Sequence, residues 1–335
     1  MTIAASDRVS ISSFDGAMLR VVLLMDLHEG TEPQFLAAYD QLCDQVASVP
    51  GHISDQLCQS IENPSQWLIT SEWQSAVPFL SWVNSEEHLE MVKPLSVCAR
   101  STRSFRYSVL RETGTVHVAP RRLGRLQTAP RASDGLVRSA LTFTVKPGSE
   151  QDVADILADY ASPQARVDAH TRLHRTSLFM HGNRVVRTIE VQGDLMTALQ
   201  HVARQPEVRA VEEAINPYLE VERDLDDPES ARMFFMRAAL PTVHHVMADR
   251  PDEVGIRRMA VIHQVEPGQG MGAARALAEA DEAEADRPGS LVAASTIFQR
   301  DNIVVRLLDV RGELEEPVSG RVMRLVTDRH ASAVS

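Results

Sequence analysis

Aromatic side chains and a histidine lie close together in the sequence between residues 67 and 88. Trp67, Ile69, Ser71 and Trp73 alternate at a spacing of two, which places their side chains on one face of a β-strand. His88 follows fifteen residues after Trp73. An unperturbed imidazole titrates near neutral pH, so His88 is a candidate proton acceptor.

These residues also have structural interpretations. A tryptophan on the inner face of a strand can be an ordinary core residue, and His88 can be a surface residue near a helix start. Asn63 precedes Pro64 and favours a turn without any ligand. Lys93 can be a solvent-exposed charge at the end of a helix. Both interpretations of each residue stay open at this stage.

Other motifs carry weaker signals. Gly268-Gln-Gly270-Met-Gly-Ala273 fits a relaxed dinucleotide fingerprint, but no acidic residue ends the next strand where a ribose would lie. His170 and His174 would share a strand face without a third ligand nearby, and His244-His245 are adjacent, so their rings point apart. The sequence therefore predicts neither a nucleotide site nor a metal site.

An internal repeat organises the chain. The fifteen residues from Phe179 to Gly193 match those from Phe298 to Gly312 at a constant offset of 119 residues, with seven identical positions. Both copies lie downstream of a strand-like run that ends in Pro-Gly, at Pro147 and Pro267. A third, more diverged copy opens the chain.

The first copy shows the pattern of elements most clearly. Residues 19–27 read as a buried strand, and Thr31-Glu-Pro-Gln34 offers a capping box for a helix with Phe35 and Tyr39 on one face. Strands at about 53–60 and 67–73 follow, then a helix that carries Phe79 and Trp82 and breaks near Pro94, and a closing strand around 105–109.

The order β-α-β-β-α-β is that of a ferredoxin-like sandwich, in which helices cover one face of an antiparallel sheet. We therefore predict an α+β protein with three tandem ferredoxin-like units of the dimeric α+β barrel type. The second unit should close with a strand at about 218–223. The predicted boundaries are a first unit at 1–112, a linker at 113–139, a second unit at 140–224, a linker segment at 225–256 and a third unit at 257–335.

The uncovered face of each sheet must meet solvent, a ligand or another sheet. Units two and three resemble each other most, so they are expected to pair within the chain. Unit one would then pair with unit one of a second chain, which predicts a homodimer.

Composition excludes several classes of function. The formal net charge of −12 disfavours nucleic-acid binding, which depends on Lys and Arg. The longest apolar run, 21–25, is too short to cross a membrane. Cys43, Cys58 and Cys98 form no C-x-x-C pair and suggest free thiols, so a cytoplasmic location is expected.

The first unit resembles the antibiotic biosynthesis monooxygenase family. The resemblance spans about residues 18–111 and rests on Val49-Pro-Gly-His-Ile53, Asn63-Pro64, Trp67-Leu-Ile-Thr-Ser-Glu-Trp73, Phe79 and Ser85-Glu-Glu-His88. The remainder is similar to the SchA/CurD-like domain that accompanies such a unit in aromatic polyketide and spore-pigment pathways. That likeness rests on arrangement and on Phe234-Phe235 with Pro241.

The resemblance implies oxidation of an electron-rich anthrone or phenol to a quinone by O₂, without flavin or metal. The protein would enclose the ring in an apolar pocket, stabilise the enolate and exclude bulk water. Trp73 matches the family's pocket tryptophan, and Phe79 matches an aromatic residue of the following helix. Ile69 stands where some members carry asparagine. Their helical arginine aligns near Val92 or Lys93.

The expected site residues follow from this resemblance. We expect His88 and Trp73 to take part in catalysis, and we expect substrate contacts from Trp67, Phe79, Trp82, Tyr39, Asn63 and Lys93. The expected substrate is an aromatic polyketide with O₂ as co-substrate and no cofactor. Two alternatives remain: a non-redox cyclase or folding aid that promotes ring closure, and an assembly scaffold without turnover.

Overall fold

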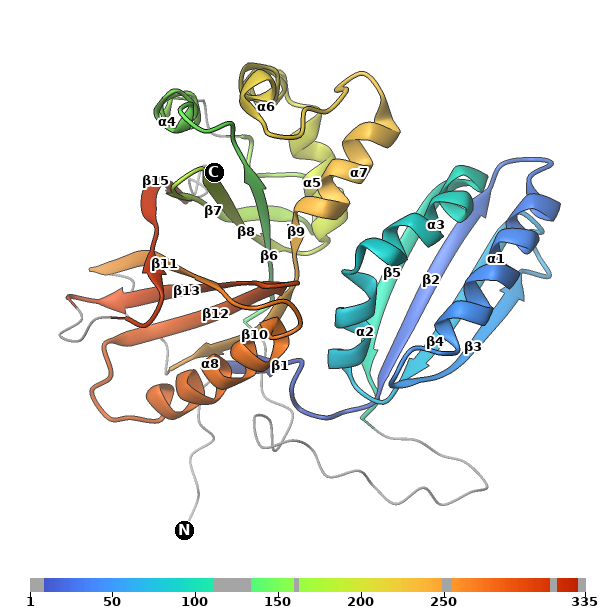
Figure 1. Ribbon diagram of the computed structural model, residues 1–335, viewed down its shortest axis with the longest axis horizontal. Coiled ribbons are helices and arrows are strands. Elements are labelled where there is room, and N and C mark those ends of the chain that lie inside the picture. The colour runs from blue at the N-terminus through green and yellow to red at the C-terminus, as the bar shows by residue number, and fades with distance from the viewer. Residues whose placement is uncertain (1–8, 111–133, 160–162, 249–254, 314–317, 331–335) are drawn as a thin grey trace, which may run out of the picture. The chain divides into compact units, whose positions relative to one another are not determined.

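The computed structural model describes residues 9–110, 134–159, 163–248, 255–313 and 318–330 of the 335-residue chain. The chain divides into two compact units. One runs from Ser12 to Pro130, and the other from Arg131 to Ser335 together with the N-terminal residues up to Ile11. They hold three antiparallel sheets with associated helices (Figure 1), which confirms the predicted α+β architecture. Most of the predicted linker at 113–139 lies outside the described residues.

The unit from Ser12 to Pro130 contains a four-stranded sheet in the spatial order β3-β4-β2-β5, with helices packed against one face (Figure 1). Phe35 from the first helix and Leu95 from the last pack on Trp67 and Ile69 of the sheet. In chain order the elements are β2 (Leu19–Leu27), α1 (Glu32–Val46), β3 (His52–Gln59), β4 (Gln66–Trp73), α2 (Ala76–Val83), α3 (Glu86–Cys98) and β5 (Ala99–Ser108).

Two local predictions for this unit are wrong. The second helix does not break near Pro94, because α3 runs through that residue to Cys98, and the break lies earlier, at Asn84 and Ser85. Thr31 makes no side-chain capping bond, since its hydroxyl donates instead to the carbonyls of His28 and Cys98.

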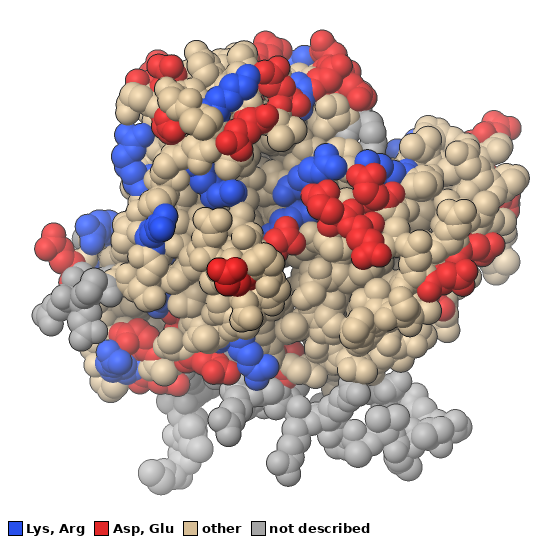
Figure 2. Space-filling view, viewed as in Figure 1, with Lys and Arg blue, Asp and Glu red and all other residues tan. Residues whose placement is uncertain are grey.

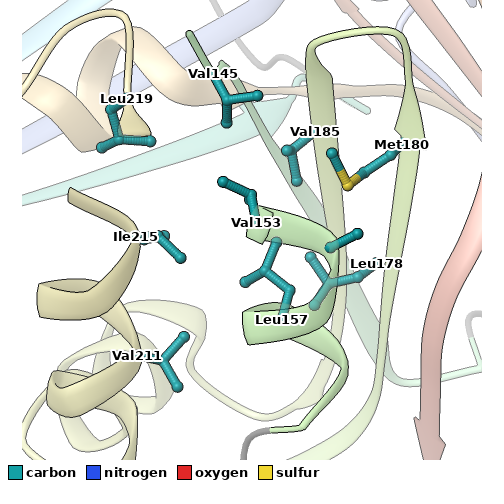
Figure 3. Close-up of a cluster of buried hydrophobic side chains, with 10 residues drawn as sticks. Val145, Val153, Leu157, Leu178, Met180, Val185, Val211, Ile215 and Leu219 are labelled. Carbon is teal, nitrogen blue, oxygen red and sulfur yellow. The ribbon is translucent and has the colours of Figure 1, made fainter. Parts of the chain in front are cut away.

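The second sheet has the order β15-β7-β8-β6-β9. Helices α4, α5 and α6 pack on one of its faces, and Figure 3 shows side chains from α4 and α6 meeting those of the strands. The elements are β6 (Leu136–Thr144), α4 (Glu150–Ala158), β7 (Arg172–His181), β8 (Arg184–Gln192), α5 (Leu195–Ala203), α6 (Pro206–Ile215), β9 (Ala239–Leu240) and β15 (Arg324–His330).

The segment at 218–223 is not the predicted closing strand. A short 3-10 helix, η1 (Asn216–Tyr218), precedes it, and Leu219 makes only an isolated bridge to Val145. The strand that pairs with β6 at this edge is β9, which comes after helix α7 (Pro228–Ala238).

The third sheet has the order β1-β10-β12-β13-β11-β14. Helix α8 packs against it through small residues, Ala274 and Ala278, which are fully buried. The elements are β1 (Val9–Ser12), β10 (Thr242–Met247), β11 (Ile256–Gln264), α8 (Gly270–Ala285), β12 (Val292–Arg300), β13 (Ile303–Arg311) and β14 (Arg321–Val322).

The second and third sheets pack against each other through an apolar layer, as the internal repeat predicts. Phe179 and Val186 of the second sheet meet Phe298 and Val305 of the third, and all four are buried. A charged group lies in the same layer, where Arg258 binds both Glu190 and Asp309. The segment predicted as a linker at 225–256 contributes β9 to one sheet and β10 to the other.

Charged side chains of both signs are interspersed on the face of the molecule drawn in Figure 2. Lys and Arg do not gather into a continuous basic surface among the described residues visible there. The described helices include none that is long and apolar enough to cross a membrane.

Candidate functional site

Four of the expected site residues form one aromatic cluster in the first unit. The Trp73 ring stacks on Trp82 with ring centroids 5.4 Å apart and planes 29° apart. Phe79 meets Trp73 edge-on at 5.4 Å, and the His88 imidazole meets Trp82 edge-on at 4.2 Å. Pairs in these geometries stabilise by about 0.5–1.5 kcal/mol beyond their buried area. The end of β4, helix α2 and the start of α3 therefore converge on one site.

Local sequence fixes the orientation of the two central residues. Trp73 is the last residue of β4 and is fully buried, with its indole N–H donating to Ser71 Oγ at 2.6 Å. Ser85 caps α3 by accepting the backbone N–H of His88, which places the imidazole on the first turn. His88 is buried, so its interpretation as a surface residue is wrong.

A groove of about 570 Å³ opens beside this cluster, which is within the size range of small-molecule sites. One side is the end of α1 and the residues after it, including Ser48 and Pro50. Helices α2 and α3 form the other side. Trp82 is the member of the aromatic cluster that lines this groove.

Gly51 sets the spacing at one end of the groove. Its φ is +90°, and a Cβ at this position would lie 2.6 Å from Pro78, which also lines the groove. Only glycine satisfies both conditions without a shift of the neighbouring helix.

Trp67 and Tyr39 lie apart from the cluster, in the apolar core formed with Phe35. Trp67 packs on Phe35 with ring centroids 5.3 Å apart. Burial raises the pKa of the Tyr39 phenol well above its usual range, and its hydrogen bond with Cys43 raises it further. Tyr39 therefore keeps its proton at neutral pH, and these two residues act as core.

Asn63 and Lys93 lie on the surface. The Asn63 side chain accepts hydrogen bonds from the backbone and hydroxyl of Ser65, which stabilises the turn before β4. Lys93 binds Glu90 one turn earlier on α3. The structure does not bring either residue to the aromatic cluster.

A close contact between His52 and Asp55 at this site was not predicted from the sequence. His52 meets Trp73 edge-on at 5.1 Å, and its Nε2 lies 2.8 Å from Asp55 Oδ2. Both side chains are largely buried. The signal in the sequence was the position of His52 directly after Pro50-Gly51, the same segment that borders the groove. Imidazoles thus flank both sides of the Trp73–Trp82 stack.

The glycine-rich segment at 268–273 has a structural role. A Cβ at Gly270 would collide with the backbone of Asp301, so this glycine allows α8 to start close to the turn between β12 and β13. Across the described residues, no group of three or more His, Cys, Asp or Glu side chains has a metal-binding arrangement.

Comparisons with known proteins match two family models. Residues 18–94 match the antibiotic biosynthesis monooxygenase model, and residues 136–248 match the SchA/CurD like domain. The aromatic cluster and all the groove-lining residues fall in the first segment.

Relatives along most of the chain come from Streptomyces. The polyketide synthase CurD of Streptomyces cyaneus is 61% identical over 93% of this chain and 84% of its own length. A 42.8 kDa protein in the whiE locus of Streptomyces coelicolor is 59% identical over 92% of this chain and 77% of its own length. Protein SchA of Streptomyces halstedii is 55% identical over 97% of this chain and 87% of its own length.

One of the solved structures that match part of the chain is SnoaB of Streptomyces nogalater, a cofactor-independent oxygenase. It is 14% identical, with a TM-score of 0.27, and the match covers 29% of this chain and 96% of SnoaB.

Proposed function

The chain belongs to the SchA/CurD family, with an antibiotic biosynthesis monooxygenase domain at its N-terminus, and from this premise we propose that it oxidises an aromatic polyketide intermediate. The proposed reaction converts an anthrone-type ring to a quinone with O₂ and no cofactor. The methylene carbon loses two hydrogens and gains one oxygen atom, and the second oxygen atom leaves as water. The reaction therefore balances with the substrate as the only reductant.

The observation that supports this proposal best is the groove wall formed by Trp82. A flat ring bound there would lie against an indole that is stacked on Trp73 and touched by the His88 imidazole. A neutral imidazole can accept the proton whose loss makes the ring electron-rich. We assign that role to His88, and we assign Trp73 and Phe79 the role of holding Trp82 in place.

His52 is the second imidazole of the site and serves as the comparison for His88. It contacts Trp73, which does not line the groove, and it is paired with Asp55. We therefore propose that His52 positions Trp73 and that His88 accepts the proton.

The test uses 1,8-dihydroxyanthrone as substrate and follows quinone formation with and without O₂. We expect no quinone under anaerobic conditions, and with ¹⁸O₂ one labelled atom in the quinone. His88→Gln should lower kcat by about 10²–10⁴-fold, the usual contribution of a general base. His52→Gln should have a smaller effect on kcat.

Other outcomes would contradict the proposal. A polyketide product that forms equally well without O₂, with no change in oxidation state, would support the cyclase alternative. Full turnover in a His88→Gln, Trp82→Ala double variant would remove the first unit from the reaction. Absence of turnover with any aromatic polyketide would favour a scaffold.

We further propose that the first unit mediates a homodimer. The sheet face that α1 and α3 leave uncovered carries apolar side chains, including Leu24 and Tyr107, which are 41% and 53% exposed. Cross-strand pairing puts Val22 and Phe105 on the same face. The second and third sheets bury their equivalent faces against each other, so a second copy of the first sheet is the matching occupant.

Light scattering tests this assembly. Tyr107→Glu should convert a dimer to a monomer, whereas Ile61→Glu, at a fully exposed turn residue away from this face, should leave the mass unchanged. A monomeric wild-type protein at micromolar concentration would contradict the proposal.

A further inference from the structure

Two serine hydroxyls that line the groove of the first unit, those of Ser48 and Ser85, act as hydrogen-bond acceptors toward a ligand. The Ser48 hydroxyl already donates to the carbonyl of Gln45 at 2.7 Å, and the Ser85 hydroxyl donates to the carbonyl of Trp82 at 2.7 Å. Each hydroxyl has a single proton, so both oxygens face a ligand only as acceptors. The indole Nε1 of Trp82 is buried and is not exposed to the groove.

Glu87 adds a negative charge to this wall. It lies in the first turn of α3, lines the groove and is exposed. A carboxylate is an acceptor with no proton to donate at neutral pH. None of the groove-lining residues in the described part of the chain is Lys, Arg or His, so apart from His88, which contacts Trp82 behind the groove wall, a ligand would find no basic partner there.

The charge and the hydrogen-bonding capacity of the groove together constrain its ligand. A phenol hydroxyl donates to serine oxygens and to a carboxylate, whereas a ligand carboxylate would find donors only at Gln45 and Ser81 and would place a negative charge near Glu87. A flat ring is accommodated on the face of Trp82.

We propose that this groove selects hydroxylated aromatic ligands that lack a free carboxylate, and that Glu87 enforces the selection. This inference rests on the proposed function for the location of the site, and it adds the class of substrate. Glu87 acts as a specificity residue and takes no part in the oxidation itself. Any carboxyl group of the polyketide must therefore be removed or esterified before the intermediate binds here.

The test measures binding, so it does not depend on turnover. The probes are 1,8-dihydroxyanthraquinone and its 3-carboxylic acid, which differ by one carboxylate and are already oxidised. All three tryptophans, at positions 67, 73 and 82, lie in the first unit, so quenching of tryptophan fluorescence reports on this unit. Titrations are done with the full-length protein at pH 7.5 and low salt.

We expect the wild-type protein to bind the neutral probe about tenfold more tightly than the acid, a difference of about 1.4 kcal/mol. Glu87→Gln should reduce this ratio to about threefold or less by improving the affinity for the acid, and Glu87→Lys should reverse it. High salt, about 0.5 M, should also reduce the ratio, because Glu87 is exposed and its field is screened.

Glu86→Gln is the matched control. Glu86 lies in the same first turn of α3 but does not line the groove, so its replacement removes the same charge from the helix start. It should leave the ratio near the wild-type value. Urea midpoints of both variants check that α3 remains folded.

The outcomes separate this inference from the proposed oxidation. Equal affinity of the wild-type protein for both probes, or an unchanged ratio in Glu87→Gln, overturns the selection. If neither probe binds, the groove is not the site and both proposals fail. A preserved preference in a protein that does not oxidise the anthrone supports the selection and contradicts only the oxidation.

Discussion

The indole of Trp82 stacks on the indole of Trp73 at 5.4 Å, and only Trp82 lines the groove. Trp73 is fully buried behind it and is tied to Ser71 by its N–H. One ring is thus available to a ligand while the other supports it. The two tryptophans should therefore respond differently to substitution.

Trp73→Ala should destabilise the first unit by about 3–5 kcal/mol, the usual cost of removing a large buried aromatic side chain. Trp82→Ala should reduce the free energy of unfolding by less, because Trp82 is partly exposed. Its main effect should be a loss of affinity for 1,8-dihydroxyanthraquinone. Hydrogen exchange of β4 and probe titration measure the two effects. Equal loss of stability in both variants would contradict the distinction.

Gly51→Ala should be more damaging than Gly30→Ala. Both glycines have positive φ, +90° and +81°, so both substitutions carry the backbone strain of about 1–2 kcal/mol. A Cβ at Gly30 meets open space, whereas at Gly51 it meets Pro78. We expect Gly51→Ala to lose more stability than Gly30→Ala because of this clash. It should also bind 1,8-dihydroxyanthraquinone more weakly, because Pro78 lines the groove. Similar probe affinity in the two variants would argue against a role for Gly51 in shaping it.

The unit formed by the second and third sheets should lose stability on mild acidification. Complete burial lowers the pKa of His245 well below its usual 6.5, and the charge of Arg138 lowers it further, although Asp134 opposes this. The unfolded chain therefore binds a proton that the folded chain excludes. Stability is complete above pH 6.5 and falls as the pH decreases below it, by about 1.4 kcal/mol per pH unit for one such proton.

Far-UV circular dichroism and hydrogen exchange of β10 measure this effect, since tryptophan fluorescence reports only on the other unit. Burial also lowers the pKa of His263 and His330, which add contributions of the same sign. His245→Gln should reduce the dependence of stability on pH without abolishing it. An unchanged pH dependence in this variant would show that His245 is not its source.

Asp328→Asn should loosen β15 from the second sheet. Asp328 accepts hydrogen bonds from Arg175 Nε at 2.9 Å and from Ser177 Oγ at 2.9 Å, both on the neighbouring strand β7. Burial, the largest single influence, raises the pKa of Asp328, but the hydrogen bond and charge of Arg175, the Ser177 hydroxyl and the charge of Arg258 together outweigh it and hold the pKa below its usual 3.8. Its stabilisation is therefore present above pH 3.8 and is lost as the pH falls through the lower folded value.

We expect Asp328→Asn to cost about 1–3 kcal/mol at neutral pH and to speed hydrogen exchange of β15. Leu325→Ala, at a position on the same strand that is 42% exposed, is the control and should have little effect. Unchanged exchange of β15 in Asp328→Asn would contradict a role for this pair in holding the strand.

Periodicity predicted the elements that depend on short-range patterns. The helix face with Phe35 and Tyr39 and the shared strand face of Trp67, Ile69, Ser71 and Trp73 were both available from spacing alone. The closing strand of the second unit could not be found in this way. Its two residues, Ala239 and Leu240, are too short to show a period, and they follow a helix that interrupts the repeat.

The site was only partly predictable for a related reason. Spacing suggested that Phe79 and Trp82 share a helix, but the convergence of Trp82 on both Trp73 and His88 depends on the break between α2 and α3 at Asn84 and Ser85. The proximity of His52 to Asp55 and Trp73 depends on the irregular start of β3, where the register with β4 shifts. A count of apolar positions does not reveal such a shift.

A single residue, Pro241, separates β9 from β10, and these strands belong to different sheets. Strand β15 returns to the second sheet from the far end of the third repeat. No cut between the second and third repeats would yield two self-sufficient fragments, because each would lack an edge that the other encodes. Gene fusion, deletion and recombination in this family should therefore keep residues 131–335 together, and a transferred copy should also need strand β1 from the N-terminus, which forms an edge of the third sheet.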